Sequence, residues 1–307
     1  MSSKSDKHKT AFDLESKVVQ PPTLQTPLQN VPENEAIELS KKRKHSPSRE
    51  NLDQAPSHGQ RSILKFKNES PWNSYRKEFG CELAGDAVAV VHSKNPSRVL
   101  LLRSYPDAIS SKMLQWFSQH QHPHIMSAKE AYFFKNSLYI ICEDLPLTVE
   151  HLIVCRAYPT EGQLAVIMRQ ILEGLSYLVT QGLEHQALKS SNILMNLDGI
   201  VKIGSLEDVQ ARDQNRDQRA TLDAIKTITM ELMEKHTKKN GTTGVNDLKR
   251  WPVDSNAVKF LAATDSVSSV DELRKHQLIR QCTATEGELV GLARFALVST
   301  RTFYSYP

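Results

Sequence analysis

The sequence predicts an α+β protein in which a small β-rich part precedes a larger helical part, after a disordered N-terminal tail. Three observations lead to this prediction. The composition changes near residue 71, four short β-prone runs follow before residue 145, and helical periodicity dominates from Thr160 onward. The chain has 307 residues, of which 39% are hydrophobic and 24% are charged, as in a globular protein with a disordered segment.

Residues 1–70 are expected to form a disordered basic tail. This segment holds six of the fourteen prolines, lacks a sustained apolar period, and carries +3 of the chain's formal charge of +4. It would bury too little apolar surface to offset its ordering entropy. Because the remainder is then close to neutral, a broad nucleic-acid-binding face is not expected.

A compact basic run in this tail consists of Lys41, Lys42, Arg43 and Lys44. The run resembles a monopartite nuclear localisation signal, which would engage the nuclear import machinery. The alternative is a solvated charge run without a partner. Both the nucleus and the cytoplasm therefore remain open as intracellular locations.

The chain has no features of a membrane or secreted protein. No run of about 18 apolar residues occurs, so no membrane span is expected. The polar start, MSSKSDKHKT, lacks the apolar region of a secretory signal. The four cysteines are far apart and form no CxxC pair, so neither a zinc site nor a disulfide framework is expected, which fits a reducing compartment.

Two strand pairs are predicted in the first part of the folded region, followed along the chain by helices. The strands are expected at 87–91, 98–103, 131–134 and 138–142, because these runs are rich in β-branched, aliphatic and aromatic residues. A short helix is expected at 110–121, between the two pairs.

A long helix is expected from Thr160, because Thr160 and Gln163 have capping-box spacing and apolar residues follow at helical intervals. Short strands at 193–194 and 201–203 come next. An amphipathic helix is expected at 222–232. A second capping box, at Ser269 and Glu272, predicts a helix at 270–276.

Four motifs appear in the order found in protein kinases. Residues 185–194, HQALKSSNIL, resemble the kinase catalytic loop, and Ser205 stands where an Asp-Phe-Gly motif would begin. Residues 138–145, LYIICEDL, resemble the fifth strand and hinge, with Cys142 at the gatekeeper position. Residues 122–125, HPHI, resemble the turn after helix C. Over roughly residues 75–280 the chain therefore resembles a serine/threonine protein kinase.

The resemblance implies a bilobal protein-kinase-like fold within residues 71–280. It implies a small β-rich N-lobe at about 75–145 and a shortened helical C-lobe at about 146–280. Residues 281–307 would form a C-terminal extension, whose apolar stretch is expected to pack on the chain itself.

Several charged groups of the kinase template are replaced. Ala187 stands in place of the catalytic aspartate and Ser205 in place of the metal-binding aspartate. A hydroxyl is a poor ligand for Mg²⁺, which prefers carboxylate oxygens. If the segment is strand-like, Glu207 is the nearby carboxylate on the same side as Ser205.

The predicted phosphate-binding elements are also altered. Arg103 is the best match to the strand-three lysine, and Met113 stands where helix C would offer a glutamate. Of the three loop glycines only two remain near 80–85, and Gly85 is the better match. The resemblance implies a nucleotide cleft lined by Gly85, Arg103, Cys142, Glu143, Leu145 and Leu194.

Lys189 and Asn192 are retained from the catalytic loop. They would neutralise a phosphate and hold a metal, or alternatively brace the loop, as asparagine does in turns; the second role is favoured.

The stretch from Ser205 to the next helix spans about fifteen residues and lacks Ala-Pro-Glu, so a substrate platform is not expected. His120, His122 and His124 alternate, but at a predicted turn a metal site is not expected.

The sequence therefore favours a pseudokinase, a kinase-like interaction or regulatory module without phosphotransfer, whose protein partner the sequence does not name. No cofactor or metal is expected. One alternative is an ATP- and Mg²⁺-dependent serine/threonine kinase with altered catalytic residues. The other is a nuclear chromatin or nucleic-acid accessory that acts through its basic tail.

Overall fold

The computed structural model describes residues 64–213, 216–236 and 244–303. No helix in these ranges is both long and apolar enough to cross a bilayer. In chain order the elements are β1 (Lys65–Lys67), η1 (Pro71–Asn73), β2 (Tyr75–Glu82), β3 (Asp86–His92), β4 (Asn95–Pro106), α1 (Asp107–Gln119), β5 (Ala128–Phe134), β6 (Ser137–Cys142), β7 (Leu147–Thr148), α2 (Val149–Val154), α3 (Glu161–Thr180), β8 (Leu183–His185), η2 (Ser190–Asn192), β9 (Ile193–Met195), β10 (Val201–Ile203), η3 (Leu206–Asp208), β11 (Val209–Ala211), α4 (Arg219–Glu234), α5 (Asn256–Ser266), α6 (Val270–Arg274), α7 (Gln277–Arg280), η5 (Glu286–Glu288) and α8 (Leu289–Phe303).

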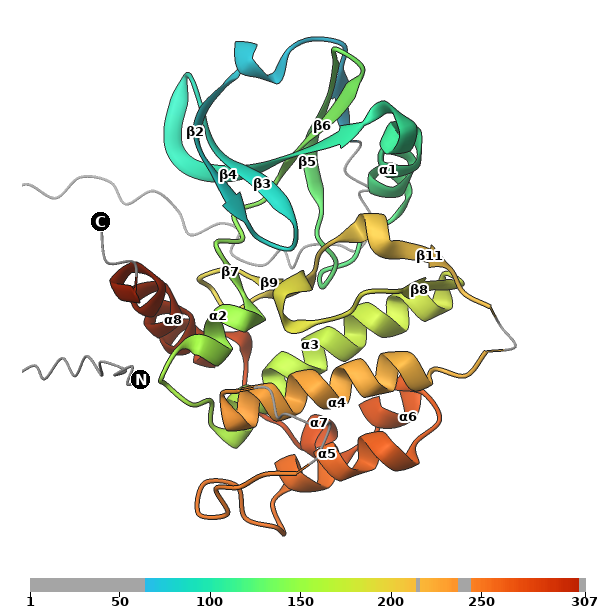
Figure 1. Cartoon of the computed structure of the whole chain (residues 1–307), viewed down its shortest axis with the longest axis vertical. Helices are drawn as coiled ribbons and strands as arrows, with labels where there is room; N and C mark the ends of the chain where they lie inside the picture. Colours follow the sequence, from blue (N-terminus) through green and yellow to red (C-terminus); the bar gives the residue numbers. More distant parts are fainter. Residues whose placement is uncertain (1–63, 214–215, 237–243, 304–307) are drawn as a thin grey trace, which may run out of the picture. The chain divides into compact units, whose positions relative to one another are not determined.

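The first part is a six-stranded sheet in the order β1-β5-β6-β4-β3-β2, and the helices follow it (Figure 1). This arrangement confirms the predicted α+β fold with a β-rich lobe and a helical lobe. The four predicted strands are present as β3, β4, β5 and β6, and α1 begins three residues earlier than predicted. Apolar side chains such as Val90, Leu102 and Ile140 are almost fully buried, because the central strands pack on both faces.

The edge strand β1 corrects the predicted boundary of the disordered tail. β1 pairs in parallel with β5, so the prediction of disorder is wrong for residues 64–70. The Lys67 ammonium lies 3.1 Å from Glu130 Oε2 and donates to the Tyr132 hydroxyl at 2.9 Å. These partners are more than 60 residues away along the chain, so local periodicity could not reveal the strand. The basic run Lys41–Lys44 lies outside the described residues.

The long helix α3 is the centre of the helical lobe and contacts α4, α5, α6 and α7. Its predicted capping box is confirmed. The Gln163 N–H donates to Thr160 Oγ1 at 3.2 Å, and the Thr160 N–H donates to Gln163 Oε1 at 3.0 Å. These two bonds satisfy N–H groups that the first helical turn leaves free.

The second predicted capping box forms only in part. The Glu272 N–H donates to Ser269 Oγ at 3.2 Å, as predicted. The Glu272 carboxylate, however, accepts from the N–H and hydroxyl of Ser268, one residue before the N-cap. The helix α6 also ends at Arg274, before the predicted residue 276. A capping-box spacing therefore located the start of the helix, but not the reciprocal bond or its end.

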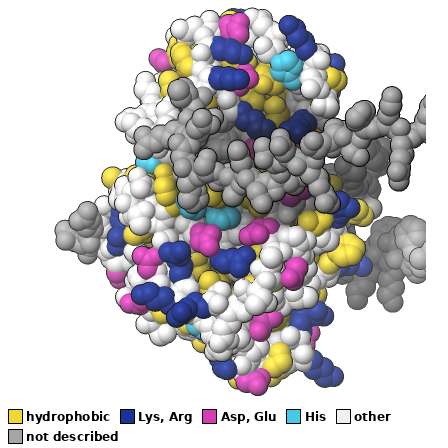
Figure 2. Space-filling view, turned by 180° about the vertical axis from the view of Figure 1, so that it is seen from behind, with side chains coloured by type: hydrophobic (Ala, Val, Ile, Leu, Met, Phe, Trp, Pro, Cys, Tyr) yellow, Lys and Arg dark blue, Asp and Glu magenta, His cyan; other side chains and the backbone are white. Residues whose placement is uncertain are grey.

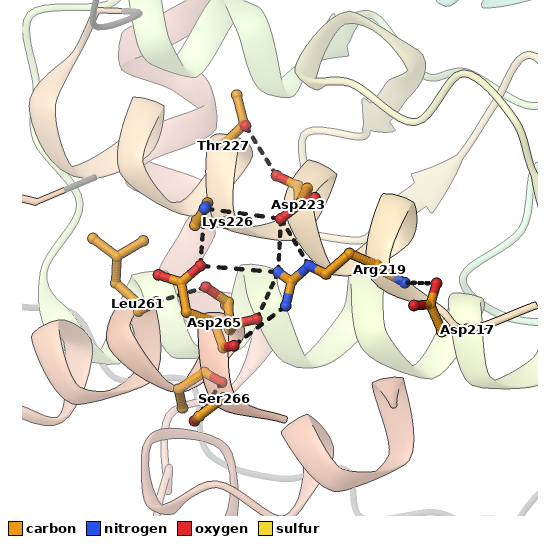
Figure 3. A network of polar contacts seen from close by, with 10 residues as sticks. Asp217, Arg219, Asp223, Lys226, Thr227, Leu261, Asp265 and Ser266 are labelled. Carbon is orange, nitrogen blue, oxygen red and sulfur yellow. Dashed lines mark hydrogen bonds and ion pairs between the residues drawn. The ribbon is translucent and has the colours of Figure 1, made fainter. Parts of the chain in front are cut away.

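A network of charged groups joins the start of α4 to the end of α5 (Figure 3). Arg219 donates to Asp223 Oδ1 from Nε at 3.0 Å and from Nη2 at 2.7 Å, and Nη2 also donates to Thr264 O at 2.8 Å. Lys226 Nζ lies 2.9 Å from Asp265 Oδ1. These contacts hold α4 in place directly after the short segment that follows β11.

The C-terminal helix α8 packs against α2, as Figure 1 shows at the side of the helical lobe. Its buried face consists of Leu289, Leu292, Ala293 and Ala296. The expectation that this apolar stretch packs on the chain itself is therefore confirmed.

Lys235, at the C-terminus of α4, is held in a partly buried position. Its Nζ donates to Leu152 O at 2.6 Å and lies 5.4 Å from the centre of the Tyr158 ring, which also contacts Arg250. Burial is the main cause that lowers the pKa of Lys235 to about 8. An ordinary lysine, as in the unfolded chain, titrates near 10.4.

We expect Lys235 to make the protein more stable as the pH rises from 8 to about 10. In this range the unfolded chain binds more protons at Lys235 than the folded chain does, so the free energy of unfolding increases with pH. After allowance for solvent screening, the gain is about 1 kcal/mol. Urea denaturation at pH 7.5 and 9.5 would measure it by comparison with Lys235→Met, which removes the titrating group. Identical pH dependence in the two proteins would contradict the prediction.

Candidate functional site

The turn between β2 and β3 lies where the sequence predicts a loop over nucleotide phosphates. Its residues are Leu83, Ala84 and Gly85. Ala84 and Gly85 have positive φ angles of 55° and 95°, and the Leu83 N–H donates to Gly85 O at 3.0 Å. Gly85 suits this left-handed backbone because it has no Cβ. Leu83 is 7% exposed and Ala84 is 2% exposed, so the tip of this hairpin is buried in the protein.

Arg103 lies on β4, opposite Ile140 of β6, and is 2% exposed. Its Nη1 donates to Ala84 O at 2.9 Å, and its Nη2 donates to Leu83 O. Two backbone carbonyls of the β2–β3 turn therefore occupy the terminal guanidinium nitrogens, which are the groups that bind phosphate side by side. Met113 of α1 is fully buried, in agreement with a packing role.

Ser205 is buried and contacts the same turn. Its hydroxyl donates to Ala84 O at 2.9 Å, so this carbonyl accepts from both Ser205 and Arg103. The neighbouring Gly204 is close to the turn as well, because a Cβ built on it would lie 2.7 Å from the Ala84 Cβ. Ser205, which replaces the metal-binding aspartate of the kinase template, is thus in direct contact with the β2–β3 turn.

Glu207 does not lie on a strand as predicted. Ser205 adopts a left-handed conformation, with φ of 47°, and residues Leu206–Asp208 form the 3₁₀ helix η3. Glu207 Oε1 lies 3.5 Å from the point where a Cβ on Gly85 would be, and Arg103 Nη1 lies 3.6 Å from the same point. Because Ser205 is left-handed and the next three residues are helical, the alternation of side chains along a strand does not apply to this segment.

The catalytic-loop segment is braced by hydrogen bonds between its own residues and Gly204. The Ala187 N–H donates to His185 Nδ1 at 3.2 Å, so the proton of the neutral ring lies on Nε2, which donates to Gly204 O at 3.0 Å. Burial lowers the pKa of His185, which favours this neutral form. The Asn192 side-chain amide donates to Ala187 O at 2.7 Å. These are the contacts of a residue that braces the loop.

The two other catalytic-loop positions contribute little to the site. Ala187 places a methyl group where a carboxylate would be needed, and it is partly buried. Lys189 is exposed, and its ammonium makes no ion pair or hydrogen bond with the described residues. The loop is therefore ordered by its own hydrogen bonds but lacks a carboxylate at position 187.

The hinge residues are held by contacts within the protein. Cys142 is fully buried at the end of β6, and burial raises the pKa of its thiol to about 12. Glu143 Oε1 accepts from the Ser127 hydroxyl at 2.9 Å and lies 2.9 Å from Lys202 Nζ. The Glu143 side chain is therefore engaged in an ion pair that joins the hinge to β10.

Leu145 and Leu194 are fully buried in the same hydrophobic core as Cys142, Leu83 and Ala84. Leu83 and Ala84 belong to this core as well, and sequence reasoning missed them. The residue types of Leu83 and Ala84 could have indicated that this loop is buried. Leucine and alanine at the tip of a loop that ordinarily holds glycine provide apolar surface that is suited to burial.

These residues do not fit a magnesium–nucleotide complex. Positions 187 and 205 lack the carboxylates that hold the metal and orient the reacting hydroxyl. The terminal nitrogens of Arg103 are bonded to Leu83 O and Ala84 O. A phosphate could approach them only after the turn had moved away.

The three alternating histidines have structural contacts. His122 stacks on the Tyr177 ring with 4.8 Å between the ring centres, and burial lowers the pKa of His122 to about 4. His124 Nδ1 lies 3.0 Å from Val201 O and its Nε2 lies 3.1 Å from Glu173 Oε2. Among the described residues, no group of three or more potential ligands is placed to hold a metal ion.

Comparison with known proteins finds one matching family and several similar proteins. Residues 107–246 match the protein kinase domain family, so the match begins at α1 and leaves out β1 to β4. Over 82 residues, 27% of this chain, the sequence is 39% identical to the serine/threonine-protein kinase CST20 of Candida albicans. Over 103 residues, 34% of this chain, it is 31% identical to the serine/threonine-protein kinase shk1/pak1 of Schizosaccharomyces pombe. The chain spans only 7% and 16% of the lengths of these two relatives.

Proposed function

Since the chain belongs to the protein kinase superfamily, we propose that it is a pseudokinase, a kinase-like domain that acts as a protein-interaction or regulatory module without phosphotransfer. One observation carries the proposal. The β2–β3 turn is hydrogen-bonded to Arg103 and to Ser205, the two residues that should face the phosphates and the metal. The partner is then recognised by the surface of the lobes and not by their shared cleft.

The two missing carboxylates and the hydrogen-bonded β2–β3 turn both oppose phosphotransfer. Phosphoryl transfer depends on positioning and on charge stabilisation, so a chain without two carboxylates offers little that favours the transition state over the ground state. Opening the turn would also break three hydrogen bonds, two of them from a charged donor, at a cost of about 3 to 7 kcal/mol before new contacts form. A cost of only about 4 kcal/mol lowers the apparent nucleotide affinity by roughly 1,000-fold.

The names of the relatives favour a second candidate, an ATP-dependent serine/threonine kinase with an altered mechanism. In that case Lys189 would neutralise a phosphate, Asn192 would hold the metal, and the Arg103 guanidinium would leave the β2–β3 carbonyls and bind the nucleotide. Glu207, whose Oε1 lies beside Gly85, would provide a carboxylate for the metal. This candidate requires a conformation in which the turn is open.

We expect ATP to leave the melting temperature of the full chain unchanged, with or without Mg²⁺ or Mn²⁺. A ligand that binds only the folded state raises stability by about 2.7 kcal/mol at 100 times its Kd. For a domain of this size that corresponds to roughly 5 to 10 °C. Thermal denaturation at 1 mM nucleotide would therefore detect a Kd of about 10 µM or tighter.

The control is the metal ion alone, because it reports any stabilisation that does not involve nucleotide. A rise that requires both ATP and the metal would contradict the pseudokinase proposal and favour the second candidate. Its dependence on Asn192 would then be tested with Asn192→Ala in a phosphotransfer assay.

A further inference from the structure

A groove of about 560 Å³ runs along α3 and is bordered on its other side by α6 and α7. None of its lining residues belongs to the predicted nucleotide site. On α3 it is lined by Arg169, Glu173, Ser176 and Thr180, which recur at intervals of three and four residues and therefore form one stripe. From Arg169 to Thr180 the helix rises by eleven steps of about 1.5 Å, or about 16 Å, which is the length of roughly five residues of extended peptide.

The groove has more positive than negative charge. Arg169, Arg274, Lys275 and Arg280 line it together with only two carboxylates. Both carboxylates have partners. Asp271 Oδ1 accepts from the Ser176 hydroxyl at 2.7 Å and lies 3.3 Å from Arg274 Nη1, while Glu173 lies 3.1 Å from His124 Nε2.

Two of the cations are free to bind an incoming group. Arg169 is 3.3 Å from Glu286, and Arg274 is shared with Asp271. Lys275 and Arg280, by contrast, are exposed and make no ion pair or hydrogen bond with their side chains within the described ranges. Hydrogen bonds from Ser268 lower the pKa of the exposed Glu272 carboxylate, and the Lys275 charge helps to lower it without forming an ion pair with Glu272. Figure 2 shows Lys and Arg interspersed with Asp and Glu over the helical part of one face.

The lining combines these charges with an apolar residue. Ile279 of α7 is 8% exposed and lines the groove between Lys275 and Arg280 in sequence. Because cations lie on both sides of an elongated groove, the groove is complementary in charge to an extended peptide with several acidic side chains. A single compact anion would instead require the cations to converge on one point.

We propose that this groove, lined by α3, α6 and α7, is a docking surface for an acidic, carboxylate-rich segment of a partner protein. Lys275 and Arg280 provide the unpaired positive charge, and the length of the groove accommodates about five extended residues. The proposal does not depend on whether the chain binds nucleotide.

The test is the binding of a fluorescein-labelled peptide with five consecutive glutamates to the full chain, followed by fluorescence anisotropy at 50 and 150 mM salt. The variant is the double charge reversal Lys275→Glu with Arg280→Glu. The matched control is Lys94→Glu with Arg98→Glu, which changes the net charge equally at exposed positions on the sheet lobe. Circular dichroism and melting temperature establish that both variants are folded.

We expect the groove variant to weaken binding at least tenfold and the control to change it less than threefold. Each exposed charge pair contributes modestly to binding, and a charge reversal adds repulsion to the lost attraction. At physiological ionic strength screening is substantial beyond about 8 Å, so distant charges matter little. Absence of binding to the unaltered chain, or equal losses in the two variants, would overturn the proposal.

A phosphoserine peptide of equal charge and a neutral glycine–serine peptide complete the experiment. The neutral peptide should not bind. If the phosphopeptide binds through Lys275 and Arg280 while the glutamate peptide does not, the surface recognises phosphate and the proposal of a carboxylate-rich partner is wrong.

Discussion

Replacing Gly204 with alanine should destabilise the protein and loosen the β2–β3 turn. A Cβ at this position would lie 2.7 Å from the Ala84 Cβ, 2.9 Å from Leu194 Cδ1 and 3.2 Å from Asn192 O. The Leu194 side chain can move, but the Ala84 Cβ is fixed to the backbone of the turn. Overpacking of this kind costs about 1 to 3 kcal/mol. Urea denaturation would measure the loss, and hydrogen exchange at residues 82–86 would report the loosening.

The control is the double variant Gly204→Ala with Ala84→Gly. Removing the Ala84 methyl group takes away the closest of the three contacts, so part of the lost stability should return even though Ala84→Gly alone leaves a small cavity. The two substitutions should therefore couple favourably. Additive effects would mean that the turn does not lie against Gly204. A loss confined to the helical lobe, with unchanged exchange at 82–86, would lead to the same conclusion.

The same variant bears on the proposed function. If the β2–β3 turn keeps phosphates from Arg103, loosening the turn with Gly204→Ala should increase the affinity for nucleotide. ATP should then raise the melting temperature of the variant more than that of the unaltered protein. If the missing carboxylates dominate, ATP should fail to stabilise either protein in the presence of Mg²⁺. The two melting experiments therefore distinguish the closed turn from the missing carboxylates as the reason why nucleotide does not bind.

The elements of the fold that depend on local signals could be predicted. The runs that became β3, β4, β5 and β6 are β-prone and lie close together along the chain, and the Thr160 capping box is complete within four residues. Their hydrogen bonds and packing pairs are formed by neighbours, so periodicity and spacing contain the necessary information.

Two of the elements that were missed, β1 and β11, depend on distant partners. The strand β2 was missed as well, although its partner β3 is adjacent in the chain. β1 is three residues long and exists because Lys67 finds Glu130 and Tyr132. β11 is likewise only three residues long and pairs with β8. Such short strands have little intrinsic preference, and their pairing free energy comes from a segment that the local sequence does not identify.

The candidate site shows the same division. The positions of Ala187, Asn192 and Ser205 follow from the order of the motifs, and the structure places them around Gly204. The filling of the site by Leu83 and Ala84 does not follow from that order. Arg103 is 19 residues from Ala84 and Ser205 is 121 residues from it, and only the fold brings the three together.

Arg103 illustrates why a retained charge does not ensure a retained role. A guanidinium presents donors in a fixed fork, which can bind two backbone carbonyls as well as two phosphate oxygens. In this chain the fork faces Leu83 O and Ala84 O. A buried charge requires partners, and once the turn provides them the arginine stabilises the closed arrangement.

The largest loss of stability is expected from Gly199→Ala, in the turn between β9 and β10. A Cβ on Gly199 would lie 2.0 Å from Glu286 O in η5 and 3.0 Å from the Leu289 Cβ at the start of α8. Gly199 also has a φ of 89°, which disfavours residues with a side chain. The backbone carbonyl cannot rotate away, so either the turn or η5 and α8 must shift, and we expect a loss of about 3 kcal/mol or more.

Gly182→Ala is the matched control, because Gly182 has a φ of 69° but nothing within 4 Å of its added Cβ. It measures the conformational cost alone, about 1 kcal/mol. The excess loss in Gly199→Ala then measures the contact between the β9–β10 turn and the C-terminal extension. Hydrogen exchange should also increase across residues 289–300, because α8 would separate from α2. Equal losses in the two variants, with α8 still protected, would show that the C-terminal helix is not held by this turn.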